Sequence, residues 1–392
     1  MKKSKKLLAL LLSLTMVFAL AACGSGTSGG DSGTAESPAA GGETTPTATE
    51  YKVAMITDYG DITDQSFNQT TYEACSAFCE ANNVPFEYFK PAGDSTAERV
   101  AMVDAAVADG YNVVVMPGFA FGETITQVAD INPDVTFIAL DVSQDDLGSY
   151  TLPENVYCAV YQEELCGYMA GYAAVKLGYT HLGFLGGMSV PAVVRYGYGY
   201  VQGADAAAAE LGVDVTVEYV YGNAFAGDAD ITAYMDNWYQ NLGVEVVFAS
   251  GGSIYTSAAE AAAKVNGKLI GVDVDQAPII DSGYGEGMTV TSAMKGLSAT
   301  VNHMLTETIL NGNWAQYGGK VDTLGLVDGS DPEANYVQIP MESTQWDDSF
   351  TQDDYKTLVS QMYDGTITVS NDISVEPEVS AITVNYYGNV KG

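Results

Sequence analysis

Hydrophobic and polar positions alternate with a regular rhythm from residue 51 onward. Short runs rich in Val, Ile and Phe indicate buried strands, and longer segments with apolar residues every three or four positions indicate amphipathic helices. The first predicted set has strands at 51–57, 86–90, 112–116, 136–140 and 156–160, and helices at 67–82, 97–109, 122–129 and 163–177. The second has strands at 181–185, 215–221, 244–249 and 268–273, and helices at 192–211, 228–241 and 254–265. Apolar strands separated by helices predict parallel sheets, so we expect an α/β protein with two doubly wound lobes.

Three further elements follow the second set. A helix at 295–310, a strand at 322–327 and a helix at 353–363 are expected to cross back between the lobes. Residues 370–392 have β character, but the sequence assigns them no role.

Acids and glycines recur where the predicted strands end. The positions concerned are Asp58, Gly118, Asp141, Gly251, Gly252 and Asp273. Ligands of open parallel sheets bind at the carboxyl ends of the strands. If the lobes face each other, these residues converge on one ligand cleft between them.

The first 50 residues have the features of a secreted lipoprotein. A basic start is followed by an apolar run from Leu7 to Ala22, which is shorter than the roughly 20 residues that a spanning helix needs. Leu20-Ala21-Ala22-Cys23 closes the run and predicts a signal peptide at 1–22 with lipidation of Cys23. Residues 23–50 combine that lipidated Cys with small and polar residues, typical of a flexible tether. We therefore expect a protein on the outer face of the cell membrane, although an ordinary signal peptide is the alternative.

Composition excludes several functions. A net charge of −35 repels the phosphates of nucleic acids and of anionic lipid head groups, which leaves the lipid as the membrane anchor. Arg99 and Arg195 are the only arginines in the sequence, so an uncharged or weakly charged ligand is favoured. No phosphate-binding loop, nucleophile elbow or zinc-protease motif is present, and we predict neither catalysis nor a cofactor nor a metal site.

Four cysteines follow Cys23. They are Cys75, Cys79, Cys158 and Cys166. Two disulfides are conceivable in an oxidising compartment, but Cys75 and Cys79 lie four residues apart in a predicted helix, which is a poor geometry for a bridge. The sequence favours buried apolar thiols.

Two aromatic residues and one lysine are candidates for ligand contact. Phe67 follows the first predicted strand, and Phe225 occupies the corresponding loop of the second set, so the two rings could enclose one flat ligand. Ordinary core packing is the alternative for both. Lys295 could pair with Asp273 and donate to a ligand hydroxyl, or it could be a solvated lysine in the first turn of a helix.

Six segments in this order carry a family resemblance. They are TDYGDITDQSFNQ at 57–69, FIALD at 137–141, GFLGGMSVPAVVRYGYGYVQGA at 183–204, GVEVVFASGG at 243–252, GVDVDQ at 271–276 and TSAMK at 291–295. The chain resembles the basic membrane protein family of PnrA-like substrate-binding lipoproteins, and the likeness extends from about residue 51 to 363. The resemblance implies a periplasmic binding protein fold of type I, which closes around its ligand by a hinge.

The resemblance also implies a ligand and roles for the candidate residues. The ligand is a purine nucleoside of the adenosine, guanosine or inosine type, and the partners are the permease and ATPase subunits of an ABC importer. Phe67 and Phe225 would enclose the base, and its edge would bind Asp58, Asn68 and Asp141. The ribose hydroxyls would bind Gly251, Asp273 and Lys295.

The expected lobes are discontinuous in the sequence. Residues 51–158 and about 276–313 form the first, residues 159–275 and about 314–345 form the second, and residues 346–392 form a C-terminal helix and tail. We expect a monomer. A receptor for a sugar or another small polar ligand and a surface sensor or adhesin are the alternative functions.

Overall fold

The computed structural model describes residues 51–391, so the predicted signal peptide, Cys23 and the tether lie outside the described residues. The first sheet contains six strands, with these bounds: β1 Val53–Ile56, β2 Phe86–Phe89, β3 Val113–Pro117, β4 Thr136–Leu140, β5 Val156–Tyr161 and β11 Lys320–Leu324. Their spatial order is β11-β5-β4-β3-β1-β2, and all neighbours are parallel.

The second sheet contains seven strands. Their bounds are β6 His181–Gly186, β7 Val215–Tyr221, β8 Val246–Ser250, β9 Lys268–Asp273, β10 Thr289–Lys295, β12 Val337–Gln338 and β13 Ile382–Asn389. The order is β12-β10-β9-β8-β6-β7-β13, and only the β10–β12 pair is antiparallel. The predicted α/β class with two largely parallel sheets is confirmed.

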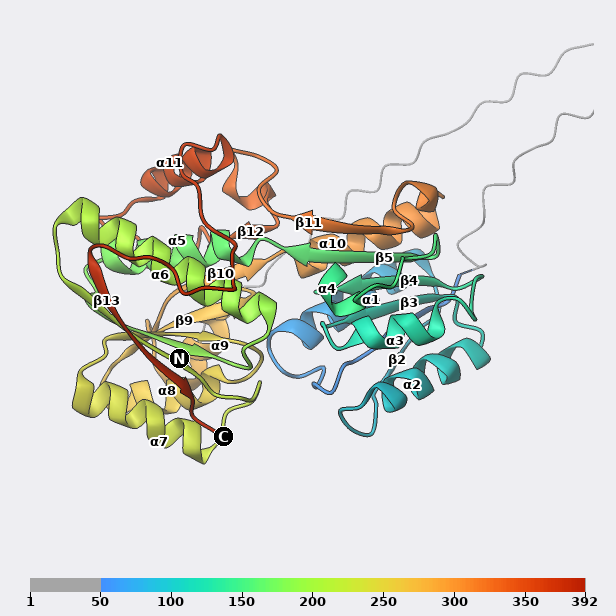
Figure 1. Cartoon of the computed structure of the whole chain (residues 1–392), viewed down its shortest axis with the longest axis horizontal. Helices are drawn as coiled ribbons and strands as arrows, with labels where there is room; N and C mark the ends of the chain where they lie inside the picture. Colours follow the sequence, from blue (N-terminus) through green and yellow to red (C-terminus); the bar gives the residue numbers. More distant parts are fainter. Residues whose placement is uncertain (1–50, 392) are drawn as a thin grey trace, which may run out of the picture. The chain divides into compact units, whose positions relative to one another are not determined.

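Helices cover both faces of each sheet (Figure 1). Their bounds are α1 Phe67–Asn82, α2 Thr96–Ala108, α3 Phe121–Val128, α4 Gln144–Leu147, α5 Glu163–Lys176, α6 Pro191–Leu211, α7 Ala229–Asn237, α8 Tyr255–Ala263, α9 Ala277–Tyr284, α10 Leu297–Leu305 and α11 Gln352–Tyr363. Strand β8 shows the layering, because Phe248 packs in one core cluster with α5 and α6 whereas Val247 packs in another with α7 and α8. In the first sheet, α1 and α10 lie on one face and α2 and α3 on the other. Each sheet with its helices is called a lobe below.

The chain passes between the lobes three times, after β5, after β10 and between β11 and β12. Backbone hydrogen bonds tie these crossovers together: Gln162 donates its N–H to the carbonyl of Leu324 at 2.9 Å, and Gly296 donates to that of Tyr336 at 2.7 Å. The crossovers therefore lie side by side between the two sheets.

Several elements differ from the expectation. The predicted helix at 295–310 begins only at Leu297, because residues 289–295 form β10, which lies between β9 and β12 in the second sheet. Strand β10 belongs to the second sheet and β11 to the first, so each lies in the lobe opposite to the one expected for its segment. Two other elements of these segments agree with the expectation, because α10 packs against α1 in the first lobe and β12 lies in the second sheet. Helix α9 and strand β13 were not predicted.

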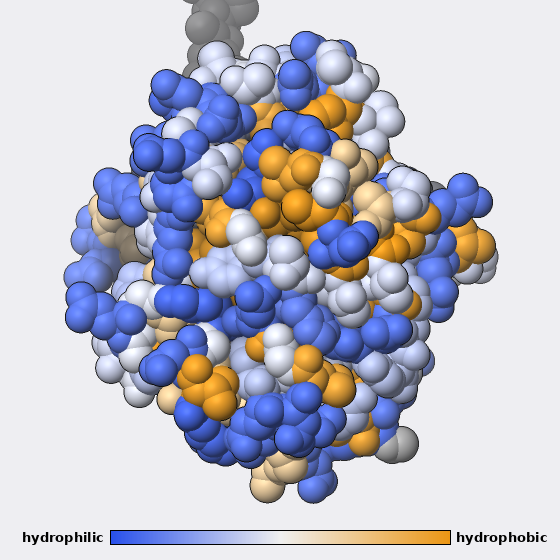
Figure 2. Space-filling model, turned by 90° about the vertical axis from the view of Figure 1, so that its left-hand side faces the viewer, coloured by the Kyte–Doolittle hydropathy of each residue, from blue (hydrophilic) through white to orange (hydrophobic). Residues whose placement is uncertain are grey.

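The four described cysteines are free and buried. Burial raises the thiol pKa of each, as expected of apolar side chains rather than reactive ones. The prediction of buried thiols is confirmed. On the face shown in Figure 2, hydrophilic residues predominate and hydrophobic ones gather in the upper half.

Candidate ligand-binding site

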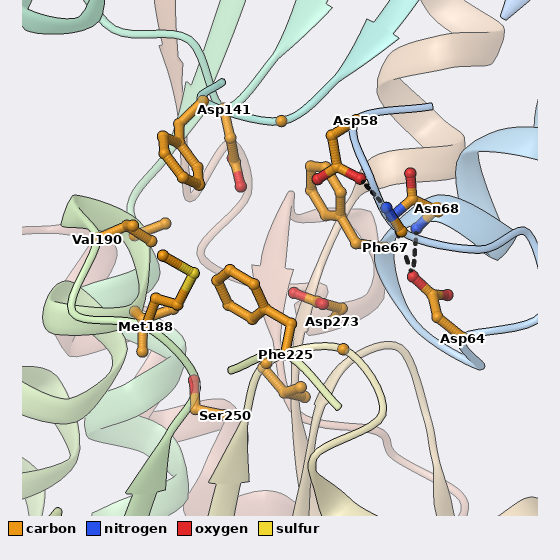
Figure 3. A pocket seen from close by; sticks show the side chains of 18 of the residues that line it. Asp58, Asp64, Phe67, Asn68, Asp141, Met188, Val190, Phe225, Ser250 and Asp273 are labelled. Carbon is orange, nitrogen blue, oxygen red and sulfur yellow. Dashed lines mark hydrogen bonds between the residues drawn. The ribbon is translucent and has the colours of Figure 1, made fainter. Parts of the chain in front are cut away.

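A cavity of about 570 Å³ lies between the lobes, at the carboxyl ends of the strands of both sheets. Its volume is typical of small-molecule sites, which span about 300–1,000 Å³. All ten residues predicted from the sequence line it, and several are labelled in Figure 3: Asp58, Phe67, Asn68, Gly118, Asp141, Phe225, Gly251, Gly252, Asp273 and Lys295. The structure thus brings the candidates together, and their contact with a ligand remains a prediction.

The ammonium group of Lys295 lies in a buried network of carboxylates. Its Nζ is 2.5 Å from Asp141 Oδ2, 3.5 Å from Glu163 Oε1 and 3.6 Å from Asp273 Oδ1. Burial by itself lowers the pKa of Lys295, but the three carboxylates raise it above the ordinary value of a lysine. The predicted pairing of Lys295 with Asp273 is confirmed, and the alternative of a solvated lysine is wrong because Lys295 ends a buried strand.

Glu163 links Lys295 to a second cation. Its Oε2 accepts a hydrogen bond from Nε of Arg195 at 2.7 Å, and its side chain is fully buried. Burial raises the pKa of Glu163, whereas Arg195 and Lys295 oppose the shift. The sequence prediction missed this pair. A signal was present, because Glu163 follows the end of β5 as Asp58 and Asp141 follow their strands.

Asp58 is held by the loop that follows β1. Its Oδ1 accepts the backbone N–H groups of Tyr59 and Gly60, both at 2.6 Å. Burial raises the pKa of Asp58, and the N–H donors and the side chain of Asn68 oppose the shift. Nδ2 of Asn68 also donates to Asp64 Oδ2 at 3.2 Å (Figure 3). The amide of Asn68 is thereby oriented, with its Oδ1 left as the free acceptor.

The start of α1 joins the lobes. The side chain of Asp64 caps the helix by accepting the backbone N–H groups of Asn68 and Gln69 at 2.9 and 3.1 Å, so the hydroxyl of the N-cap residue Ser66 is not used as a cap. That hydroxyl donates to Asp273 Oδ2 of the second lobe at 2.5 Å. Nearby, Gln276 Nε2 donates to the backbone carbonyl of Gln65 at 3.0 Å. These hydrogen bonds form only while the lobes lie close together.

Two phenylalanine rings, Phe67 and Phe225, point into the cavity from opposite lobes (Figure 3). Nζ of Lys295 lies 4.7 Å from the ring centroid of Phe67, a cation–π contact that occupies one face of this ring. The ring of Tyr59 lies 6.4 Å from that of Phe225, and its hydroxyl donates to Sδ of Met188 in the other lobe at 3.4 Å. Aromatic surface is therefore available from both lobes.

The ring of Phe225 rests on bare backbone. A Cβ on Gly187 would lie 2.5 Å from this ring, and a Cβ on Gly251 would lie 2.8 Å from it. Gly251 also has φ of +139°, a conformation that side chains disfavour. The carbonyl of Phe225 accepts the N–H of Ser253 at 2.9 Å, which fixes its loop. The absence of a side chain at Gly251 thus makes room for the ring of Phe225, and this role is separate from any contact of Gly251 with a ligand.

Strained backbone and unpartnered atoms gather around the cavity. Asp141, Asn223 and Asp273 have φ of 58°, 55° and 66°, which is uncommon for residues other than glycine. Asp141 Oδ1, Asn68 Oδ1 and the hydroxyl of Ser250 are buried and have no hydrogen-bond partner among the described residues. Such groups are costly unless something satisfies them, so they are candidates for ligand contact. Ser250 was not among the predicted residues.

Two parallel-sheet lobes, three crossovers and a polar and aromatic cavity at the facing strand ends define a solute-binding protein. The chain belongs to the Bmp family, described as ABC transporter substrate-binding protein PnrA-like, which matches residues 51–367. It is therefore the substrate-binding component of an ABC transporter, a non-enzymatic class that acts outside the cytoplasm, binds small ligands and works with a permease and an ATPase. Within residues 51–391, no helix has the length and apolar character needed to cross a membrane.

Two curated proteins and one solved structure illustrate what the chain is similar to. The chain is 26% identical to the ABC transporter nucleoside-binding protein BmpA of Lactococcus lactis, over 81% of this chain and 88% of that protein. It is 27% identical to the CD4+ T-cell-stimulating antigen of Listeria innocua, over 84% of this chain and 92% of that protein. The crystal structure of an ABC transporter solute-binding protein from Aeropyrum pernix matches the fold with a TM-score of 0.63 at 21% identity, over 81% of this chain and 87% of that one.

Proposed function

We propose that this protein binds a purine nucleoside in the interlobe cavity and delivers it to the permease of an ABC importer. The observation that carries the proposal is the approach of two aromatic rings, Phe67 and Phe225, from opposite lobes into a cavity rich in carboxylates. A flat, polar heterocycle satisfies both features, because it offers two faces for stacking and an edge of hydrogen-bond donors and acceptors. The nucleoside-binding name of the Lactococcus relative supports the same ligand class.

The base edge is assigned to the first lobe. Asp141 Oδ2 is engaged by Lys295, so its unpartnered Oδ1 is the atom available to a ligand N–H. Asn68 likewise offers its free Oδ1. Asp58 also lines the cavity, and its carboxylate would accept a further ligand N–H. Acceptors next to aromatic surface suit the N–H groups of a purine.

The ribose is assigned to the second lobe. Asp273 already accepts from Ser66 and Tyr196, at 2.5 and 3.3 Å, but a carboxylate has about four lone-pair sites and can accept a further hydroxyl. Lys295 supplies a donor beside it. A sugar hydroxyl can both donate and accept, so an acid and an ammonium group form a suitable pair for a ribose.

The charge of the cavity favours a nucleoside over a nucleotide. Its acidic residues are Asp58, Asp61, Asp64, Asp94, Asp141, Asp146 and Asp273, and its basic residues are Arg195 and Lys295. Both cations are engaged by buried carboxylates. A phosphate group would therefore meet excess negative charge without a free cationic partner.

Closure follows from the contacts between the lobes. Ser66 bonds to Asp273 and Tyr59 bonds to Met188, in each case across the cleft. A ligand that contacts both lobes favours the closed form, because only differential affinity shifts such an equilibrium. In this proposal the closed monomer docks on the permease, and a lipid on Cys23 holds the protein at the outer face of the membrane.

Thermal unfolding with a ligand panel tests the proposal. The protein is first unfolded and refolded to remove co-purified ligand, and then heated with adenosine, guanosine, inosine, uridine, ribose and GMP. A ligand at 100 times its Kd stabilises the folded state by about 2.7 kcal/mol, which corresponds to a few degrees in Tm. We expect the purine nucleosides to raise Tm and ribose and GMP to have no effect. A rise with sugars alone would contradict the proposal and favour a sugar receptor.

A further inference from the structure

The chain continues beyond the segment that matches the family. That match ends at residue 367, whereas residues 382–389 form β13, which adds a parallel strand to the edge of the second sheet beside β7 (Figure 1). In the register of this pair, Val384 lies opposite Val217 and Tyr386 opposite Tyr219. Residues 380–391 are called the β13 strap below.

The strap is anchored along its length by side chains of the second lobe. At its start, Asp205 Oδ1 accepts the backbone N–H groups of Ser380 and Ala381 at 2.8 and 2.7 Å. In its middle, the carboxylate of Glu218, which is 4% exposed, accepts the hydroxyl of Tyr387 at 2.6 Å and the amide of Asn385 at 3.1 Å. These specific contacts hold the strap in one register against β7.

The end of the strap reaches the loop that carries Phe225. Val390 donates its N–H to the carbonyl of Tyr221 at 2.7 Å, where β7 ends and the loop begins. Val390 also packs on the same core cluster as Ala224, the neighbour of Phe225. Lys391 forms an ion pair with Asp228 at the other end of this loop.

Asp228 connects that ion pair to the helix that follows. Its Oδ1 accepts the backbone N–H groups of Asp230 and Ile231 at 2.9 and 3.0 Å and so caps α7, while its Oδ2 faces Lys391. The strap therefore holds the loop from 222 to 228 at both ends. On the cavity side, the contact between Phe225 and Ser253 holds its middle.

We propose that the β13 strap is a positioning element of the ligand site, which holds the 222–228 loop so that the ring of Phe225 stays in its binding orientation. The contacts described above join the strap to α6, β7 and this loop, and none of them is made with a predicted ligand-binding residue. Lys391 is thus a positioning residue and acts through Asp228. The contacts between the strap and the 222–228 loop do not involve the ligand. Only the expected effect of the strap on ligand dissociation rests on the proposed function.

The test uses the full chain with Lys391→Met, the conservative variant Lys391→Arg, and Lys356→Met as the control. Lys356 is an exposed lysine on α11 that pairs with Asp353. Amide hydrogen exchange is measured over residues 222–231 without ligand, and inosine dissociation is measured by stopped flow. We expect Lys391→Met to accelerate both by about twofold to fivefold, the factor that corresponds to one partly exposed ion pair, and Lys391→Arg to restore both.

Unchanged loop exchange in Lys391→Met, or a change that Lys356→Met reproduces, would overturn the proposal. Faster exchange with unaltered inosine dissociation would overturn the positioning of Phe225. If the unmodified protein binds no inosine, the nucleoside assignment fails, while the exchange rates still decide whether the strap holds the loop.

Discussion

Replacing Lys295 by methionine removes the ammonium group from a buried site and keeps most of the length of the side chain. Asp141, Glu163 and Asp273, whose oxygens lie 2.5 to 3.6 Å from Nζ of Lys295, then lose their shared cation. Arg195 remains as the cation that contacts Glu163. Removing one partner of a buried ion pair costs about 3–5 kcal/mol. We expect the free energy of unfolding to fall by an amount in that range at pH 7.

The loss of stability should depend on pH in a defined direction. Burial already raises the pKa of Glu163, and Lys295 is one of the two cations that oppose the shift, so its removal raises this pKa further. An acid with a raised pKa in the folded state binds a proton more tightly than in the unfolded state. Protonated Glu163 therefore stabilises the folded state at low pH, and this stabilisation is lost as the pH rises through the pKa of Glu163 in the folded state. The deficit of the variant should be smaller at pH 5 than at pH 7.

Urea unfolding at the two pH values, followed by circular dichroism, measures the deficit. Lys264→Met is the matched control, because Lys264 pairs with Asp236 at 2.8 Å but is 46% exposed. An exposed pair contributes about 0–1 kcal/mol. A deficit for Lys295→Met no larger than that of the control, or one that grows as the pH falls, would refute the reasoning about the buried network.

Three further predictions address the cavity and the anchor. Gly251→Ala should weaken purine nucleoside binding by about 1–3 kcal/mol, because the new Cβ collides with the ring of Phe225. Calorimetric titration measures the affinity, and the control Gly283→Ala should bind normally, because nothing lies within 4 Å of a Cβ at that position. Affinity should fall as the pH decreases toward the raised pKa of Asp58, because protonation removes the acceptor, and Asp58→Asn should flatten the profile; an identical pH dependence in both proteins would exclude this role. Cys23→Ser should release the protein from the cell into the medium, and continued sedimentation with membranes would argue against the lipid anchor.

The hydrophobic pattern was sufficient for most of the fold and failed where buried strands are polar. Strand β10 reads Thr-Val-Thr-Ser-Ala-Met-Lys, and a search for apolar runs passes over it. Its hydroxyls are satisfied in the interior: Thr289 bonds to Asp281, Thr291 to Thr344, and Ser292 accepts from the backbone of Gln276. Burial of polar side chains depends on partners distant in the sequence, which periodicity does not reveal.

Strand β13 was missed for a related reason. It mixes apolar, polar and aromatic residues at the edge of a sheet, and its partner β7 lies more than a hundred residues earlier in the chain. The local sequence carries its β character but not its place in the sheet.

Position at a strand end was sufficient to predict several of the residues that line the cavity. Asp58, Asp141 and Asp273 were found by their position alone, and all three line the cavity. Arg195 was missed because it lies within α6, and only the fold brings it to Glu163.

Equilibrium dialysis of the refolded protein against radiolabelled guanosine tests the nucleoside assignment most directly. We predict saturable binding at one site per chain, displaced by unlabelled inosine or adenosine but not by ribose, glucose or GMP. Absence of saturable retention, or displacement of the label by ribose alone, would contradict the assignment of the interlobe cavity to purine nucleosides.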